Sequence, residues 1–279
     1  MPVPLHTTGK ASFDDIYDRP DPREYYARMS ELDYRIPELA RPFFEQQIRD
    51  FRAATYGAAD ADGPVTVLDI GCSYGVNAAL LRFDTGIGEL AGHYRAAGED
   101  VDRATLIERD RARLAARDAW PGVRFVGIDA SRPALDYAAE AGLLHESVHA
   151  DLESADPTDE QRAILSRADL VVSTGCIGYV TEKTVTRIAA ASGDRLPWMA
   201  HFVLRMFDFG PIAAELDALG YRTEQRPGLF RQRRFASATE QRHVLNSLAD
   251  NGIDTEGNES EGWLCARLFV SRPDQGRRA

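Results

Sequence analysis

The most constraining feature of the chain is a short apolar segment that ends in a glycine-containing turn. It reads VTVLDI at 65–70 and GCSYG at 71–75. An apolar run bounded by glycine is typical of a strand buried on both faces of a parallel sheet. The apolar segment at 76–81 predicts a helix directly after the turn. A strand, a glycine turn and a helix in this order favour a nucleotide site, because the glycines admit a ligand to the backbone and the helix start offers free N–H groups.

The turn excludes two common nucleotide sites. It lacks the G-x-G-x-x-G spacing of a dinucleotide turn and the terminal Gly-Lys-Ser/Thr of a phosphate loop. Asp69 lies two residues before the first glycine, where its negative charge would repel a polyphosphate. The segment therefore suits a ligand that has a cationic end.

The segment resembles the first motif of class I, Rossmann-like S-adenosylmethionine (SAM) dependent methyltransferases of the small-molecule type. In that family an acidic residue precedes G-x-G-x-G. SAM carries a sulfonium and an ammonium group, which match Asp69. Ser73 stands where the family has its middle glycine, so a different hold on the methionine end is expected. The plain alternative is an ordinary strand-turn-helix without a ligand.

Composition limits the function classes. The 279 residues suffice for one globular domain with additions, and a net charge of −11 disfavours nonspecific binding to nucleic acid or to anionic membranes. Three widely separated cysteines give neither a disulfide framework nor metal-site spacing, so no metal site is predicted. No segment reads as a membrane span or a signal peptide, and we expect a cytoplasmic protein.

Strand and helix patterns alternate from Val65 onward. This order predicts an α/β fold with a three-layer Rossmann-like sheet, mostly parallel with an antiparallel last strand. Residues 1–62 are expected to form a helical lid or extension, and residues 63–279 the SAM-binding catalytic domain. That domain contains an insertion at about 83–121 and an added segment at about 226–262. A surface helix is predicted within the insertion at 101–120, which leaves open a second lid wall, an oligomer contact or a solvated helix.

An acidic residue follows the next strand pattern. Asp129 ends the apolar segment 123–129, and a carboxylate at the end of a strand beside a glycine turn can accept both ribose hydroxyls, as in dinucleotide folds. The resemblance assigns Asp129 the same role in SAM binding. It also places Asp151 near the adenine amine, although a carboxylate there could simply cap the following turn.

The resemblance implies a set of cofactor contacts around these strand ends. The set comprises Asp69, Gly71, Cys72, Ser73, Gly75, Asn77, Asp129, Ala130, Asp151, Leu152, Ser173 and Thr174.

Two residues are candidates for catalysis. His201 lies in a strand pattern and has a pKa suited to a general base, although a lone strand histidine is more often structural. Tyr179 follows the fourth strand, where it could shape the acceptor pocket or contact the sulfonium through a cation–π interaction. Candidate substrate contacts are the tyrosines of the extension and the arginines of later strands. They are Tyr17, Tyr25, Tyr26, Arg205, Arg231 and Arg233, with Tyr34 as a further lid residue.

The predicted function is methyl transfer from SAM to a small-molecule acceptor. If the acceptor is anionic, the arginine cluster would bind its negative group. The tyrosines could instead pack helices, and the arginines could belong to a solvated ribbon. Two alternatives stay open: an enzyme of this fold that uses SAM as the substrate of cyclisation or aminocarboxypropyl transfer and releases methylthioadenosine, and a non-catalytic SAM-binding protein. A homodimer is among the expected assemblies.

Overall fold

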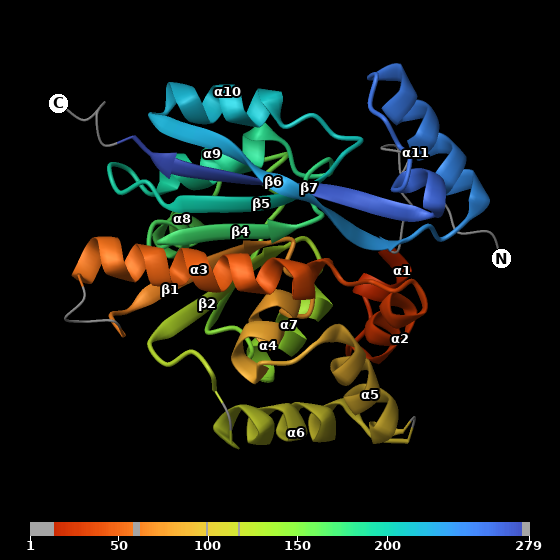
Figure 1. The fold of residues 1–279 in the computed structure, drawn as a ribbon. Coiled ribbons are helices and arrows are strands. Elements are labelled where there is room, and N and C mark those ends of the chain that lie inside the picture. Colours follow the sequence, from red (N-terminus) through yellow and green to blue (C-terminus); the bar gives the residue numbers. More distant parts are fainter. Residues whose placement is uncertain (1–13, 58–61, 99, 117, 275–279) are drawn as a thin grey trace.

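A seven-stranded sheet forms the centre of the computed structural model, which describes residues 14–57, 62–98, 100–116 and 118–274 (Figure 1). The strand order is β3-β2-β1-β4-β5-β7-β6. The strands are β1 (Val65–Ile70), β2 (Val123–Asp129), β3 (Glu146–His149), β4 (Leu170–Thr174), β5 (Trp198–Leu204), β6 (Tyr221–Arg234) and β7 (Trp263–Pro273).

The directions of the strands agree with those predicted from the order of strands and helices in the sequence. The pairs β1–β2, β1–β4, β2–β3 and β4–β5 are parallel, whereas β7 pairs antiparallel with both β5 and β6. The carboxyl ends of β1, β2 and β4 therefore meet at one edge of the sheet. The predicted fold class, a mostly parallel sheet with an antiparallel last strand, is confirmed.

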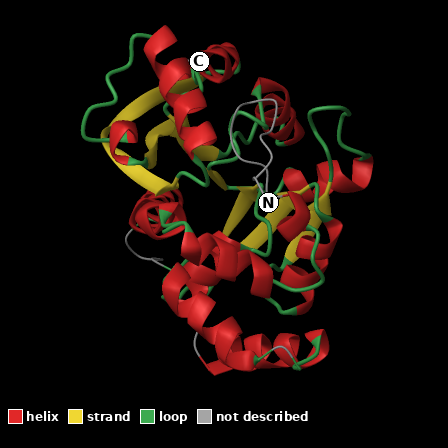
Figure 2. Ribbon diagram, turned by 90° about the vertical axis from the view of Figure 1, so that its right-hand side faces the viewer, coloured by secondary structure: helices red, strands yellow, loops and turns green. Residues whose placement is uncertain are grey.

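Helices cover both faces of the sheet, as the side view in Figure 2 shows. Buried side chains of α8, α9 and α10 pack on one face, and those of α3, α4 and α7 on the other. None of the described helices combines the length and the apolar character that a membrane crossing requires. The helices are α1 (Asp14–Tyr17), α2 (Arg23–Glu31), α3 (Ile36–Tyr56), α4 (Val76–Phe83), α5 (Ile87–Ala97), α6 (Arg103–Ala116), α7 (Arg132–Glu140), α8 (Asp159–Leu165), α9 (Glu182–Ala191), α10 (Gly210–Ala218) and α11 (Ala238–Asp250), with a 3-10 turn η1 (Glu259–Glu261).

The insertion contains two helices, α5 and α6, where one surface helix was predicted. Glycines at 86, 88, 92 and 98 made the first half look irregular. Their weak helix propensity is overridden because α5 buries Ile87, Leu90 and Tyr94. The strand β6 runs from Tyr221 to Arg234 and so extends into the segment at about 226–262 that was predicted as an addition.

A buried carboxylate joins the insertion to the core. Asp110 of α6 is fully buried and accepts hydrogen bonds from the Tyr94 hydroxyl at 2.7 Å and the Tyr137 hydroxyl at 2.8 Å. The Nε2 atom of His93 lies 3.0 Å from the same carboxyl group. Because three different helices meet at Asp110, the insertion is a packed part of the fold and not a solvated helix.

Candidate functional site

The glycine turn lies where β1 ends at the carboxyl edge of the sheet. Gly71, Ser73 and Gly75 all have positive φ, at 66°, 50° and 71°. A Cβ atom on Gly71 would lie 2.8 Å from the Cys176 Cβ, so only glycine fits there. Positive φ is costly for serine, and Ser73 adopts it because its backbone N–H donates to the Asp129 Oδ2 atom at 2.8 Å. The predicted strand, turn and helix are present, with α4 beginning at Val76.

Two polar atoms buried at this turn have no hydrogen-bond partner among the residues that the structure describes. The Ser73 Oγ and Asn77 Oδ1 atoms make no hydrogen bond within the described part of the chain, and both residues are at most 5 % exposed. Buried polar groups are otherwise nearly always hydrogen-bonded. Unpaired atoms beside a glycine turn therefore point to a ligand that would supply a donor or an acceptor.

Asp69 lies beneath these atoms. Its carboxylate is 2 % exposed and accepts from the Asn77 amide at 3.0 and 3.1 Å. Burial raises the pKa of Asp69 to about 7; the Asn77 hydrogen bond opposes the rise, and the charge of Asp129 adds to it. A buried carboxylate next to a second one is stabilised in its ionised form by any bound cation.

This raised pKa predicts a pH dependence of stability. The folded protein keeps a proton on Asp69 up to about pH 7, whereas the unfolded chain loses it near pH 4. The folded state binds more protons between these values, so the free energy of unfolding falls as pH rises, by about 2 kcal/mol from pH 5 to pH 8. Urea unfolding of the wild type and of Asp69→Asn at both pH values isolates the contribution of Asp69 to this pH dependence. An equal pH dependence in both proteins would contradict the assignment.

Asp129 ends β2 beside the turn. Its two carboxylate oxygens accept backbone N–H groups of Ser73 at 2.8 Å and Ser131 at 2.9 Å. Burial raises the pKa of Asp129, and these backbone hydrogen bonds lower it. Both oxygens are thereby fixed in direction, and each keeps a lone pair for a hydroxyl group of a ligand.

Tyrosines of the N-terminal extension reach this edge of the sheet. The Tyr34 hydroxyl is hydrogen-bonded to the Thr174 and Tyr25 side chains, and Thr174 accepts from the Asn77 amide at 3.1 Å. Burial raises the pKa of Tyr17, and the neighbouring Tyr34, Tyr179 and Asp129 raise it further. Tyr17, Tyr34 and Tyr179 are neighbours and are each half-buried, and we call them the tyrosine cluster.

The segment that precedes α2 is fixed to the glycine turn by hydroxyl groups. The Tyr74 hydroxyl contacts the carbonyl oxygens of Ile16, Tyr17 and Arg19 at 3.0, 3.2 and 2.9 Å. The Ser131 hydroxyl donates to the Tyr17 carbonyl at 2.7 Å. We call residues 16–23 the strap, because they cross the turn and end on the insertion.

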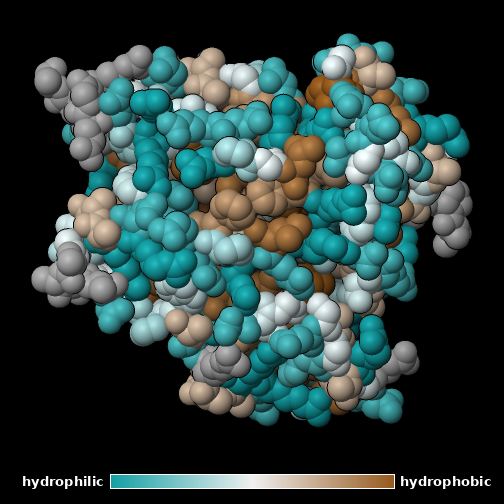
Figure 3. All heavy atoms as spheres, in the orientation of Figure 1, coloured by the Kyte–Doolittle hydropathy of each residue, from teal (hydrophilic) through white to brown (hydrophobic). Residues whose placement is uncertain are grey.

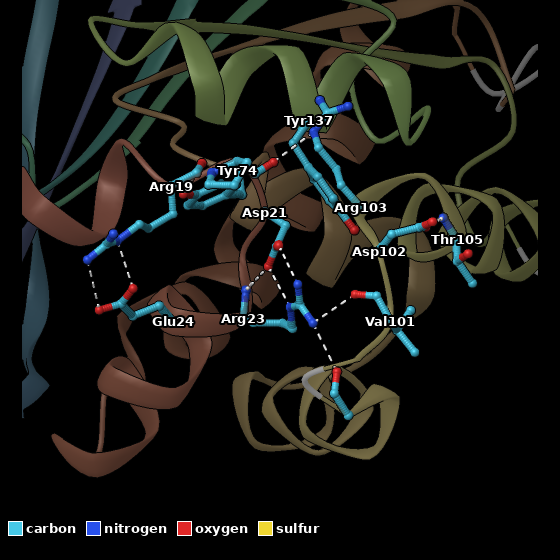
Figure 4. A network of polar contacts seen from close by, with 12 residues as sticks. Arg19, Asp21, Arg23, Glu24, Tyr74, Val101, Asp102, Arg103, Thr105 and Tyr137 are labelled. Atoms are coloured by element: carbon cyan, nitrogen blue, oxygen red, sulfur yellow. Dashed lines mark hydrogen bonds and ion pairs between the residues drawn. The ribbon is translucent and has the colours of Figure 1, made fainter.

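The insertion holds the other end of the strap (Figure 4). Arg23 pairs with Asp21 and donates to the carbonyl oxygens of Gly98 at 2.9 Å and Val101 at 3.0 Å. Arg103 donates to the Pro20 carbonyl at 2.8 Å. The insertion and the glycine turn therefore fix the strap from two sides.

Several predicted residues have their side chains engaged elsewhere in the fold. Tyr26 is 1 % exposed and stacks on Tyr94 of α5 with ring centroids 5.0 Å apart, so it packs helices. Arg205 is buried in an ion pair with Glu259 at 2.9 Å. Arg231 is exposed and lies over the Trp263 ring at 5.5 Å, outside the group of tyrosines.

Arg233 was predicted as a substrate contact, and the structure uses its charge internally. It is 1 % exposed, and its Nη2 atom lies 2.7 Å from the Glu240 Oε1 atom. The ion pair joins β6 to α11. Its charge opposes the rise in the pKa of Tyr17 and Tyr34, which burial mainly causes.

His201 is fully buried within the sheet. Its Nδ1 atom lies 2.9 Å from the Ser173 Oγ atom, and its ring faces Phe209 at 5.9 Å. Burial lowers the pKa of His201 to about 4, which makes the imidazole a weak base at neutral pH. The hydroxyl of Ser173 is fully buried with it, so neither side chain is exposed at the surface.

Asp151 lies in the exposed loop after β3. Its carboxylate accepts from the Ser154 hydroxyl at 2.6 Å and from the Glu153 N–H at 3.0 Å, and the Ser154 hydrogen bond lowers its pKa. Asp151 therefore closes the turn, and the adenine contact stays a prediction. Leu152 is buried beside it, Cys72 is buried below the turn, and Ala130 accepts from His149 at 2.9 Å.

Sequence reasoning missed Tyr74, Ser131 and Gln232. Nothing in the sequence distinguishes Tyr74 from a residue that merely fills the turn. Gln232 lies 161 residues after Gly71 and reaches the same edge only through the extended β6.

A cavity of about 390 Å³ lies elsewhere, between α3 and the strands β6 and β7. Figure 3 shows apolar atoms gathered in the hollow at the centre of this face. Phe43, Ala200, Leu268 and Val270 line it, together with charged residues such as Arg222 and Glu224. Phe43 belongs to α3, Ala200 to β5, and Leu268 and Val270 to β7, so none of these residues belongs to the glycine turn.

Comparison with known proteins gives only distant structural similarity. No family model matches the chain, and no curated protein matches it. Precorrin-6y C5,15-methyltransferase from Geobacter metallireducens GS-15 is 12 % identical, with 80 % of this chain and 87 % of that chain covered and a TM-score of 0.36. Magnesium protoporphyrin IX methyltransferase (ChlM) from Synechocystis PCC 6803, crystallised with SAM, is 14 % identical, with 82 % of this chain and 79 % of that chain covered and a TM-score of 0.36. The [4+2]-cyclase SpnF is 14 % identical, with 82 % of this chain and 80 % of that chain covered and a TM-score of 0.36. Similarity at this level carries no argument about the function of this chain.

Proposed function

We propose that this protein is a SAM-dependent methyltransferase that acts on a small molecule. The observation that carries the proposal is the pairing of two sets of groups at one sheet edge. Ser73 and Asn77 present buried oxygen atoms that have no partner among the described residues, and Asp129 presents a fixed carboxylate on the next strand. The first set fits the charged methionine end of SAM, and the second fits a ribose diol.

Each group has a defined part in holding the cofactor. The Asn77 Oδ1 atom would accept from the ammonium group, and the Ser73 hydroxyl would bind the same amino-acid end. Asp69 would supply the compensating negative charge, which binding would keep ionised. Asp129 would accept the ribose hydroxyls. SAM itself supplies an activated methyl carbon on its sulfonium.

The chain's remaining task is to position the acceptor. Alignment of two reactants can contribute much of a rate enhancement, because the entropy of bringing them together is lost on binding. The half-buried rings of Tyr17, Tyr34 and Tyr179 would form the walls of the acceptor chamber. Tyr179 follows β4 and is the candidate for contact with the methyl-bearing sulfonium. His201 is less suited to proton removal, because burial keeps it a weak base.

The strap and the N-terminal helices would act as a lid over the cofactor. We propose residues 1–62 as the lid and 63–279 as the catalytic domain; residues 1–13 and 58–61 of the lid lie outside the described residues. The arginine-based preference for an anionic acceptor, a homodimer and a cytoplasmic location stay predictions.

Labelled methyl transfer tests this function. The protein is incubated with SAM labelled on its methyl group and with fractionated small molecules from cells. We expect label in a small-molecule fraction and an equal amount of S-adenosylhomocysteine, with neither in Asp129→Ala. Absence of transfer to every fraction, together with absence of SAM binding, would refute the proposal.

One observation favours a second candidate function. Ser73 places a hydroxyl at the turn where the resemblance implies a glycine, and that hydroxyl has no partner among the described residues. A polar group at the methionine end could direct chemistry at another carbon of SAM. This reaction would release methylthioadenosine, which distinguishes it from methyl transfer.

Loss of the Tyr74 hydroxyl is expected to loosen the strap. Tyr74→Phe removes the contacts to three carbonyl oxygens, which are worth about 1 kcal/mol in total. Because the strap would close over the cofactor, S-adenosylhomocysteine should dissociate about fivefold faster in stopped-flow measurements. Tyr56→Phe is the matched control. It removes a hydroxyl that contacts the Pro64 carbonyl at 2.8 Å, at the start of β1 and not at the glycine turn. Equal dissociation rates in the two variants would contradict the lid.

A further inference from the structure

Gln232 has a side chain that the rest of the fold does not explain. It is 1 % exposed, and its Oε1 atom has no hydrogen-bond partner among the described residues. Leaving a buried amide oxygen unpaired costs free energy that an apolar residue of the same shape would avoid. Such a group therefore calls for a partner from outside the described residues.

A β-bulge directs this side chain. In the pairing of β6 with β7, Arg231 lies opposite Cys265 and Arg233 lies opposite Leu264, so Gln232 is the extra residue. A bulge turns its side chain out of the regular alternation, and bulges are frequent beside active sites. The Gln232 carbonyl accepts from the Arg35 N–H at 2.8 Å, next to Tyr34.

The bulge brings the amide to the carboxyl end of β4. A Cβ atom on Gly175 would lie 2.7 Å from the Gln232 Nε2 atom, so the amide occupies the space that a side chain would fill. Gly175 has a φ of 82° and directly follows Thr174, whose side chain is hydrogen-bonded to Tyr34. The Gln232 amide thus lies at the carboxyl end of β4, one residue from the Thr174 side chain that contacts Tyr34.

We propose that Gln232 is a specificity-determining residue that binds the methyl acceptor. Its Oε1 atom accepts a hydrogen bond from an O–H or N–H group of a small aromatic acceptor, which lies between the rings of Tyr17, Tyr34 and Tyr179. This inference rests on the proposed function, because the acceptor chamber is the one next to the SAM site. Gln232 exchanges no proton with the acceptor and serves to orient it.

The first test is a pair of probes that differ in one donor. Phenol and anisole have the same ring, and only phenol can donate a hydrogen bond. In ¹⁵N-labelled protein saturated with S-adenosylhomocysteine, phenol should shift the side-chain amide signal of Gln232, and anisole should not. The signal is assigned from its loss in Gln232→Met. Equal shifts with both probes, or no shift with phenol, would overturn the proposal.

The second test separates a binding role from a structural one. Gln232→Met should weaken phenol binding about fivefold, leave the affinity for S-adenosylhomocysteine unchanged and not lower the melting temperature, since the Oε1 atom that it removes accepts no hydrogen bond from the described residues. Gln241→Met is the matched control, because the Gln241 amide donates to the Glu259 carbonyl at 3.1 Å and its loss should lower the melting temperature. A melting temperature for Gln232→Met as low as the control's would show a structural amide. Failure of wild-type protein to bind S-adenosylhomocysteine would refute the proposed function instead, and the two probes would then be compared without it.

Discussion

Asp129→Ala is expected to weaken SAM binding about 100-fold. The carboxylate would accept two ribose hydroxyls, and hydrogen bonds to a charged group are worth about 1.5–3 kcal/mol each. A loss of about 3 kcal/mol corresponds to two orders of magnitude in the dissociation constant. The backbone N–H groups of Ser73 and Ser131 also lose their acceptor, which loosens the turn. Isothermal titration with SAM and with S-adenosylhomocysteine measures the effect.

Two variants control for indirect effects. Asp129→Asn keeps the shape and one oxygen acceptor, so its loss of affinity should be intermediate. Asp136→Ala removes an exposed carboxylate on α7 and should leave SAM affinity unchanged. Unchanged affinity in Asp129→Ala would remove the ribose assignment.

Glu240→Ala is expected to destabilise the protein by about 3–5 kcal/mol. Glu240 and Arg233 are both buried and lie 2.7 Å apart, so removal of the carboxylate leaves a guanidinium group without its counter-charge. The Ala236 N–H also loses its acceptor at 2.8 Å. Chemical denaturation measures the free energy of unfolding.

Exposure decides the size of this effect. Glu31→Ala breaks the Arg28–Glu31 pair, whose side chains are 32 % and 64 % exposed. This change should lower the free energy of unfolding by less than about 1 kcal/mol. Replacement of both partners, Arg233→Met with Glu240→Met, should recover most of the stability lost in Glu240→Ala. A loss below 1 kcal/mol in Glu240→Ala would mean that the pair is hydrated in solution.

The fold was predictable because its signals are local. Apolar runs such as 65–70 and 123–129 alternate with amphipathic helices, and this order specifies a mostly parallel sheet. The length of β6 was not predictable, since residues 226–234 are rich in arginine and pair only because β7 lies beside them. The helix α5 was missed because burial of its apolar side chains outweighs the weak helix propensity of its glycines.

The candidate site was predictable only in part. The glycine turn and Asp129 have a local pattern, and the structure places them side by side. Which polar side chains are free to bind a ligand depends on contacts between distant parts of the chain. The sequence does not show that His201 is buried beside Ser173 or that Arg233 pairs with Glu240. Gln232 has no sequence signal, because its position depends on a bulge and on the missing side chain of Gly175.

Incubation of the purified protein with SAM alone tests the central proposal most directly. Binding is followed by isothermal titration, and nucleoside products are followed by mass spectrometry. We expect SAM to bind and to remain intact above the spontaneous background, because methyl transfer requires an acceptor. Release of methylthioadenosine would show instead that SAM is itself the substrate of other chemistry, and absence of binding would contradict a SAM site at the glycine turn.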